Sequence, residues 1–189
     1  MRRQPRFQSF RKAKSVLVPK HTISPKLAQD LLSLQRGGKG RENESEYALG
    51  VRHLRILKAL YGGIQTKSLR YIAHQQGKPN LLSYLESRAD VVLFRSCFVP
   101  SLWSAQQLIA HGHVQLNHRD LQGPGTILRP GDLLTITAER PHAWPFFGKR
   151  AQHLEVDFGA SRVIYLWRPQ SIELPAPFDF DAAWKGLIV

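Results

Sequence analysis

The sequence is poor in cysteine and in long apolar runs, and each shortage excludes a class of protein. A single cysteine, Cys97, among 189 residues excludes an internal disulfide and a zinc site built from several cysteines. Both exclusions favour a reducing compartment, and the apolar neighbours of Cys97 predict a buried side chain. No uninterrupted apolar stretch approaches the roughly 20 residues that a membrane span needs, so we predict no membrane partner.

Acidic residues are also scarce, but only in the first part of the chain. Residues 1–80 contain 17 basic and 4 acidic residues, whereas residues 81–189 contain 10 of each. The first part therefore accounts for the whole formal net charge of +13. Positive charge gathered on one side favours a polyanionic partner, and we predict nucleic acid; a solvated basic tail is the alternative.

The chain begins with a strongly basic segment. Residues 1–29 contain eight Lys and Arg residues and no acid. Such a start is typical of an organelle-targeting segment and equally of a basic tail that lies across phosphates; we expect the phosphate-binding tail. A glycine-rich linker continues it to residue 43, and the "GGKG" of this linker lacks the spacing of a nucleotide-binding loop.

Residues 44–80 have helical periodicity and a basic face. Ser45 is a suitable N-cap, apolar residues recur every three or four positions from Tyr47, and a glycine pair ends the first helix. A second helix is predicted over residues 66–77. Few carboxylates lie among the basic residues off the apolar stripe, which favours phosphate contact over a solvated charged face. The basic residues are Arg52, Arg55, Lys58, Lys67 and Arg70.

A third helix is predicted over residues 81–94, where leucines and valines recur at helical spacing. Asn80 lies immediately before it and suits an N-cap. Within this helix Arg88 and Asp90 are expected to form a salt bridge that ties helices together.

The stretch from Ser101 to residue 137 predicts a helix followed by a small antiparallel sheet. Ser101 suits an N-cap and Gly112 a helix end. The period then becomes two, with a hairpin turn at Asn117-His118 and a last strand over residues 133–137. Polar side chains off the buried stripe suit hydrogen bonds to phosphates, 2′-hydroxyls and base edges. These side chains are Gln106, Gln107, His111, His113, Asn117, His118 and Arg119.

The same residues are poorly suited to catalysis, because no carboxylate pair or nucleophile accompanies them. His111 and His113 alternate along the chain, but without nearby Cys or acidic ligands they do not predict a metal site. We therefore expect no enzyme activity, no cofactor, no metal and no small-molecule substrate.

Three motifs carry a resemblance to a known family: "LESRAD" (85–90), "SAQQLIAHGHVQLNHR" (104–119) and "LRPGDLLTI" (128–136). They resemble the RNA-binding module named after small-subunit ribosomal protein S-four. Pseudouridine synthases and tyrosyl-tRNA synthetases also carry this module. The preceding stretch, residues 44–77, resembles the ribosomal protein's own helical region, so the chain is identified as a member of the S-four family.

The resemblance implies an α+β fold in four parts. A basic tail and linker (1–43) would precede a basic helical region (44–80), a module of helices packed on a short antiparallel sheet (81–137), and a β-rich C-terminal extension (138–189). It implies a structural constituent of the small ribosomal subunit, active in translation and assembly. The implied partners are small-subunit rRNA, bound in its 5′ region, and neighbouring ribosomal proteins. Arg88, Arg95 and Ser101 join the expected rRNA contacts.

The sequence also departs from the family pattern. Leu102 and Gln106 stand where the family usually has Arg, which weakens two charged contacts. His118 replaces the glycine of the hairpin turn, which is awkward if that residue must adopt a positive φ.

The extension has strand-like runs over residues 154–158 and 163–167, and it lies beyond the usual bacterial end. Because it resembles the tails of mitochondrial members, we expect a mitochondrial location, with another organelle or the bacterial cytoplasm as alternatives.

Two other functions compete with a ribosomal role. A free RNA-binding factor of ribosome rescue or stress would need only the module, and would leave the helices before it and the segment after it unexplained. An RNA-modifying enzyme would need a catalytic domain, for which the segment after the module has no room.

Overall fold

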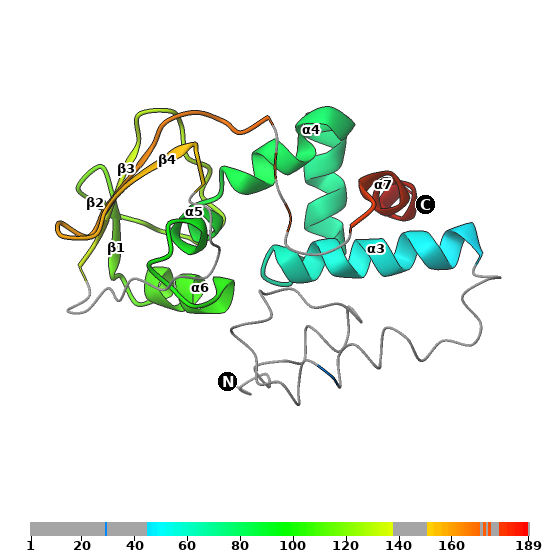
Figure 1. The fold of residues 1–189 in the computed structure, drawn as a ribbon, viewed down its shortest axis with the longest axis horizontal. Helices are drawn as coiled ribbons and strands as arrows, with labels where there is room; N and C mark the ends of the chain where they lie inside the picture. Colours follow the sequence, from blue (N-terminus) through cyan, green and yellow to red (C-terminus); the bar gives the residue numbers. More distant parts are fainter. Residues whose placement is uncertain are drawn as a thin grey trace. The chain divides into compact units, whose positions relative to one another are not determined.

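The computed structural model describes residues 29, 45–137, 151–170, 172, 174 and 178–188. The predictions for the basic tail and linker lie outside these residues. The chain divides into two compact units, Met1–Lys78 with Glu173–Val189 (unit 1) and Pro79–Ile172 (unit 2). Figure 1 shows the helices and strands of both units and labels most of them.

The described part of unit 1 is mainly helical, and its helix α3 begins and ends where the sequence predicts. Helix α3 spans Glu46–Leu60, and the Ser45 hydroxyl accepts the N–H of Ala48 at 3.3 Å as its N-cap. Gly62 and Gly63, both with positive φ, follow its end. Tyr47 was expected on the buried stripe, but 65% of it is exposed because it lies in the first turn, before the buried face begins at Gly50.

A short helix near the C-terminus packs against α3, and the sequence did not predict it. Helix α7 (Phe180–Ile188) is capped by the Asp179 carboxylate, which accepts the N–H groups of Asp181 and Ala182. The two helices meet at Gly50 and Gly186. A Cβ added to Gly186 would lie 2.5 Å from the backbone carbon of Gly50, so this approach requires glycine.

Helix α4 (Thr66–Glu86) is broken at Gly77, whose φ of 70° and ψ of 171° are not helical. The predicted end of the second helix is therefore confirmed, although a helix resumes immediately after it.

The predicted continuous helix over 81–94 is wrong. Residues 87–89 bond to a neighbouring segment instead: Leu128 N–H donates to Ser87 and Ala89 N–H to Thr126. A new helix, α5 (Ala89–Arg95), then begins.

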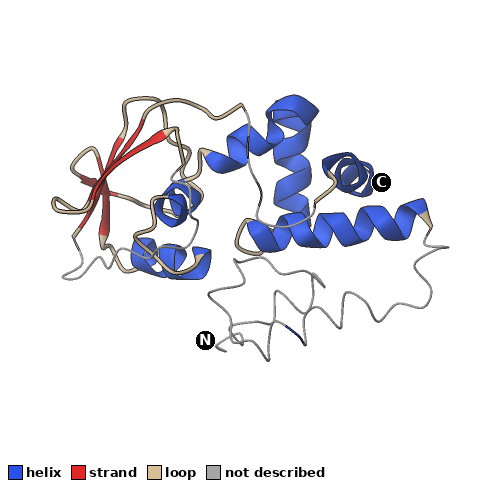
Figure 2. Cartoon of the chain, viewed as in Figure 1, coloured by secondary structure: helices blue, strands red, loops and turns tan. Residues whose placement is uncertain are grey.

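Unit 2 contains a five-stranded antiparallel sheet in the order β2-β1-β3-β5-β4, drawn red in Figure 2. The sheet confirms the α+β class and the predicted strands to within about two residues. The strands are β1 (Val114–Leu116), β2 (Arg119–Asp120), β3 (Leu133–Ile136), β4 (Leu154–Asp157) and β5 (Arg162–Tyr165). Strand β5 pairs directly with β3, with Leu134 opposite Val163.

The expected extension 138–189 is therefore divided rather than separate. Its two strands complete the sheet of unit 2, whereas its helix α7 belongs to unit 1.

Helices α5 and α6 (Leu102–Ala110) supply the other side of the unit 2 core. Ala89, Val92 and Leu93 of α5 and Ala105 and Ile109 of α6 share one apolar cluster with the inward side chains of the sheet. Cys97 is buried, as predicted. No helix among the described residues is long and apolar enough to span a membrane.

Candidate nucleic-acid interface

The predicted basic residues of unit 1 divide into exposed and engaged side chains. Lys58 donates from Nζ to the Thr66 hydroxyl at 2.8 Å, which joins the end of α3 to the start of α4. Arg70 donates from Nε to the carbonyl of Leu187 at 2.8 Å, which satisfies a carbonyl in the last turn of α7. Arg52 is half-buried, and Arg55 and Lys67 are exposed.

Arg55 and Lys67 flank the Lys58–Thr66 contact. Arg55 is three residues before Lys58 and shares its helix face, and Lys67 directly follows Thr66. We call Arg55, Lys58 and Lys67 the basic patch.

The carboxylates described in this unit are Glu46, Asp179 and Asp181, and all three are engaged away from the basic patch. Glu46 pairs with Lys185, whose ammonium lowers the pKa of the Glu46 carboxyl, and Asp181 pairs with Lys78 at 2.9 Å. Asp179 caps α7. None of these three described carboxylates pairs with the basic patch, whose charges suit an external anion.

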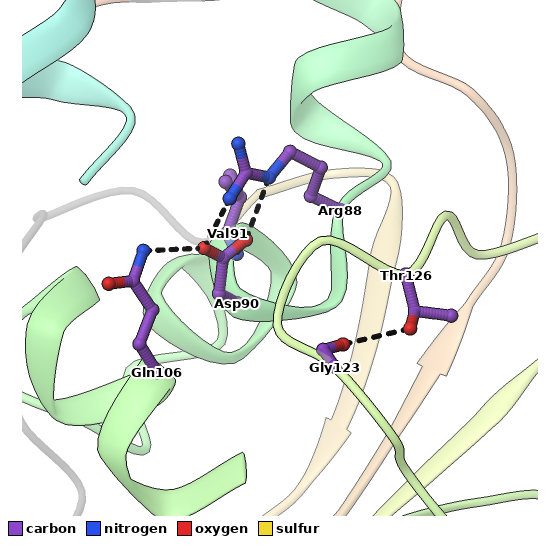
Figure 3. A network of polar contacts seen from close by, with 6 residues as sticks. All are labelled: Arg88, Asp90, Val91, Gln106, Gly123 and Thr126. Carbon is purple, nitrogen blue, oxygen red and sulfur yellow. Dashed lines mark hydrogen bonds and ion pairs between the residues drawn. The ribbon is translucent and has the colours of Figure 1, made fainter. Parts of the chain in front are cut away.

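In unit 2 two predicted contacts belong to a buried ionic network centred on Asp90 (Figure 3). The Arg88 fork donates to both carboxylate oxygens, at 3.1 Å from Nε and 2.7 Å from Nη2. Gln106 of α6 donates to Oδ2 at 2.9 Å, and the N–H of Val91 donates to Oδ1 at 3.0 Å. Asp90 is fully buried and the Arg88 side chain is 10% exposed. The predicted salt bridge exists, and Gln106 extends it from α5 to α6.

Arg95 is held in the same manner by Glu86. Its Nε and Nη2 atoms donate to the two carboxylate oxygens at 3.0 and 2.8 Å, and the Glu86 side chain is 1% exposed. Arg88, Arg95 and Gln106 therefore have structural partners, because internal carboxylates hold some of their donors. Their role as rRNA contacts stays a prediction.

Ser101 and Asn117 also have structural partners. The Ser101 hydroxyl accepts the N–H of Ser104 at 3.2 Å as the N-cap of α6, as predicted. Asn117 donates from Nδ2 to Asp132 at 2.9 Å and accepts the N–H of Leu133 at 3.0 Å. Both amide atoms of Asn117 thus fix the hairpin turn against the start of β3.

The remaining predicted residues of unit 2 are exposed in two places. Gln107, His111 and His113 lie at the surface of α6 and just after it, where the two histidine rings are 6.3 Å apart. His118 and Arg119 lie at the hairpin tip. Asn117 and His118 have φ of 49° and 66°, so His118 does adopt the left-handed conformation that favours glycine.

Trp103 was missed in the sequence analysis. It lies four residues before Gln107 on the same face of α6, and 39% of it is exposed. The four-residue spacing between Trp103 and Gln107 can be read from the sequence and would have identified Trp103 as part of this face. Among the described residues, no group of three or more His, Cys, Asp or Glu side chains is placed to hold a metal ion.

Known proteins are similar to this chain over most of its length. The S4 domain family model matches residues 87–134. The chain is 34% identical over 161 residues to small ribosomal subunit protein uS4 of Phenylobacterium zucineum, covering 78% of each chain. It is 30% identical over 158 residues to uS4 of Kosmotoga olearia, covering 77% of this chain and 76% of that one. It is 26% identical over 168 residues to uS4m of Marchantia polymorpha, covering 80% and 84%.

These matches correct one expectation and establish the family. Residues 1–137 are less than three quarters of the chain, yet the Phenylobacterium match covers 78% of it. The matched stretch must include residues after 137, so the view that the whole C-terminal segment lies beyond the bacterial end is wrong.

The identity to the two bacterial proteins is 30% or more and extends over more than two thirds of each protein. The chain therefore belongs to the uS4 family of small ribosomal subunit proteins.

Proposed function

We propose that this protein is a structural component of the small ribosomal subunit that binds small-subunit rRNA, contacts neighbouring ribosomal proteins and supports assembly of the subunit. The observation that carries the proposal is the extent of the match. Relatives named as small ribosomal subunit proteins align with more than three quarters of this chain, far beyond the S4 domain at 87–134. A free RNA-binding factor or an RNA-modifying enzyme would share only that domain.

The two units differ in charge, so we expect them to make different kinds of contact with rRNA. The described part of unit 1 has seven basic and three acidic residues, whereas that of unit 2 has six of each. Lys and Arg that neutralise phosphates release counterions, which gives salt-dependent affinity. We assign this role to the basic patch, and we assign contacts with grooves, 2′-hydroxyls and bases to the uncharged side chains of unit 2.

The test removes the two exposed charges of the patch together. Arg55→Ala with Lys67→Ala leaves the Lys58–Thr66 contact intact, so the fold of unit 1 is preserved. The probe is a transcript of the 5′ domain of small-subunit rRNA, titrated at about 50 to 200 mM salt. We expect weaker binding and a slope of log affinity against log salt that is shallower by about 1.4 to 1.8, since each of the two phosphate contacts contributes roughly 0.7 to 0.9.

The matched control replaces two exposed arginines of unit 2, Arg129→Ala with Arg162→Ala, which removes the same charge. A slope that is unchanged in the patch variant, or equally reduced in the control, rejects the basic patch. A wild-type chain that does not bind the transcript rejects the function itself.

We further propose that the protein works in a mitochondrion. A uS4m relative aligns with 80% of the chain, and the match covers 84% of that relative. The bacterial relatives make the bacterial cytoplasm the alternative. Mass spectrometry of small subunits purified separately from mitochondria and from the remaining cell lysate tests this proposal: the chain should co-purify with the mitochondrial subunit, and its absence there rejects the location.

A further inference from the structure

The exposed face of α6 carries an aromatic side chain among hydrogen-bonding ones. Trp103, Gln107 and His111 follow one another at intervals of four residues, so they form a single stripe along the helix and its C-cap. His113 continues the stripe, with its ring 6.3 Å from that of His111. Helix α6 contains no Asp, Glu, Lys or Arg.

Trp103 is not needed to attach the helix to the core. Its neighbour Leu102, together with Ala105 and Ile109, is at most 5% exposed and makes that attachment. An exposed Trp offers a large flat surface that binds strongly when a partner covers it. Gln107 and the histidines beside it offer donors and acceptors for a polar partner.

The charge of unit 2 decides which contacts this stripe can make. The described residues of the unit are neutral overall. Internal carboxylates hold Arg88, which lies just before α5, and Arg95, which lies at its end. The described residues of unit 2 therefore contribute little to phosphate neutralisation. Base stacking on an aromatic side chain does not require net charge, and it contributes substantial affinity for unpaired bases. The absence of carboxylates from α6 removes the repulsion that phosphates would meet near the stripe.

We propose that Trp103 is a base-stacking residue, whose indole ring packs on an unpaired base of small-subunit rRNA. Gln107 and His111 then donate hydrogen bonds to the phosphate or 2′-hydroxyl of the same or the next nucleotide. The inference rests on the proposed function and adds a contact to it. Stacking by Trp103 adds a contact that does not depend on net charge.

The test compares three variants of the full chain, Trp103→Ala, Trp103→Leu and Trp103→Phe, on the 5′-domain transcript. Trp103→Leu keeps an apolar side chain on the helix but removes the aromatic face, so it separates stacking from stability. We expect Trp103→Ala and Trp103→Leu to weaken binding about 10- to 100-fold, the effect of losing one stacked base, with an unchanged salt slope. Trp103→Phe should retain most of the affinity.

Trp167→Ala is the matched control, because Trp167 is 50% exposed in the same unit and lies outside the stripe. It should leave affinity unchanged. As a second readout, the transcript should quench less of the tryptophan fluorescence of Trp103→Phe than of the wild-type chain.

The outcomes separate this inference from the function on which it rests. If the wild-type chain does not bind the transcript, the ribosomal role fails. If it binds and Trp103→Leu binds equally well with an unchanged melting temperature, the stacking role is refuted while the function stands. If Trp103→Leu retains rRNA affinity but no longer enters small subunits, the stripe contacts a protein and the inference is again refuted.

Discussion

Replacement of Asp90 by alanine should be among the most damaging single changes in unit 2. The substitution removes the acceptor of four hydrogen bonds, two from Arg88, one from Gln106 and one from the N–H of Val91. It leaves the guanidinium of Arg88, 10% exposed, without its counterion. Removal of one partner of a buried ion pair destabilises a protein by about 3 to 5 kcal/mol. A domain of ordinary stability, about 5 to 15 kcal/mol, would lose a large fraction of it.

Urea unfolding of the full chain, followed by circular dichroism, measures the effect on the free energy of unfolding. Asp120→Ala is the matched control, because this exposed carboxylate accepts only one described hydrogen bond, from Gln115 at 3.1 Å. Its loss should change stability by less than about 1 kcal/mol.

A double variant separates the charge from the packing. Arg88→Met with Asp90→Leu removes both ions and leaves no uncompensated charge, so it should recover most of the stability that Asp90→Ala loses. The reasoning is refuted if Asp90→Ala is destabilised by less than about 1 kcal/mol, or if the double variant is as unstable as the single one.

Two further predictions concern single histidines. His118 has a φ of 66°, which disfavours any residue with a Cβ, so His118→Gly should raise the free energy of unfolding by about 0.5 to 1 kcal/mol; an equal or lower urea midpoint would contradict this. Burial lowers the pKa of His153, so its neutral form is favoured in the folded protein. Stability should therefore be independent of this group above its unfolded pKa of about 6.5, and should decrease as pH falls from there towards the lowered folded pKa. The non-titrating His153→Phe should show a smaller decrease between about pH 7 and 5 in thermal melts, and equal decreases would exclude His153 as a source.

Elements with local signals could be predicted from the sequence, and those fixed by distant partners could not. Helix α6 and strand β1 were predicted because the Ser101 cap, the Gly112 stop and the change of period lie in adjacent residues. The break after Glu86 was missed because its cause is pairing with residues 126–128, about 40 positions away. Helix α7 was missed because it is short and its stability depends on packing at Gly50.

The same limit applies to the candidate interface. Composition identified the basic helices, but it could not tell which cations have partners inside the fold. The pairing of Arg88 with Asp90, two residues apart, was predictable; the pairing of Arg95 with Glu86, nine residues away across the end of a helix, was not. The close approach of Arg70 to the carbonyl of Leu187 depends on the packing of α7 and leaves no trace in the local sequence.

The hairpin formed by β4 and β5 explains why unit 2 extends past the S4 domain match, which ends at residue 134. Val163 and Tyr165 are at most 1% exposed within the same core as α5 and α6, so the core is incomplete without them. Burial raises the pKa of Tyr165, and its hydroxyl bonds to Ser87 at 2.7 Å. Ser83 donates to the carbonyl of Pro169 nearby. The hairpin thereby fixes the end of α4 against the sheet. Because α5 begins two residues after Ser87, the hairpin also sets the position of Asp90 and, through Gln106, that of α6 and its exposed stripe.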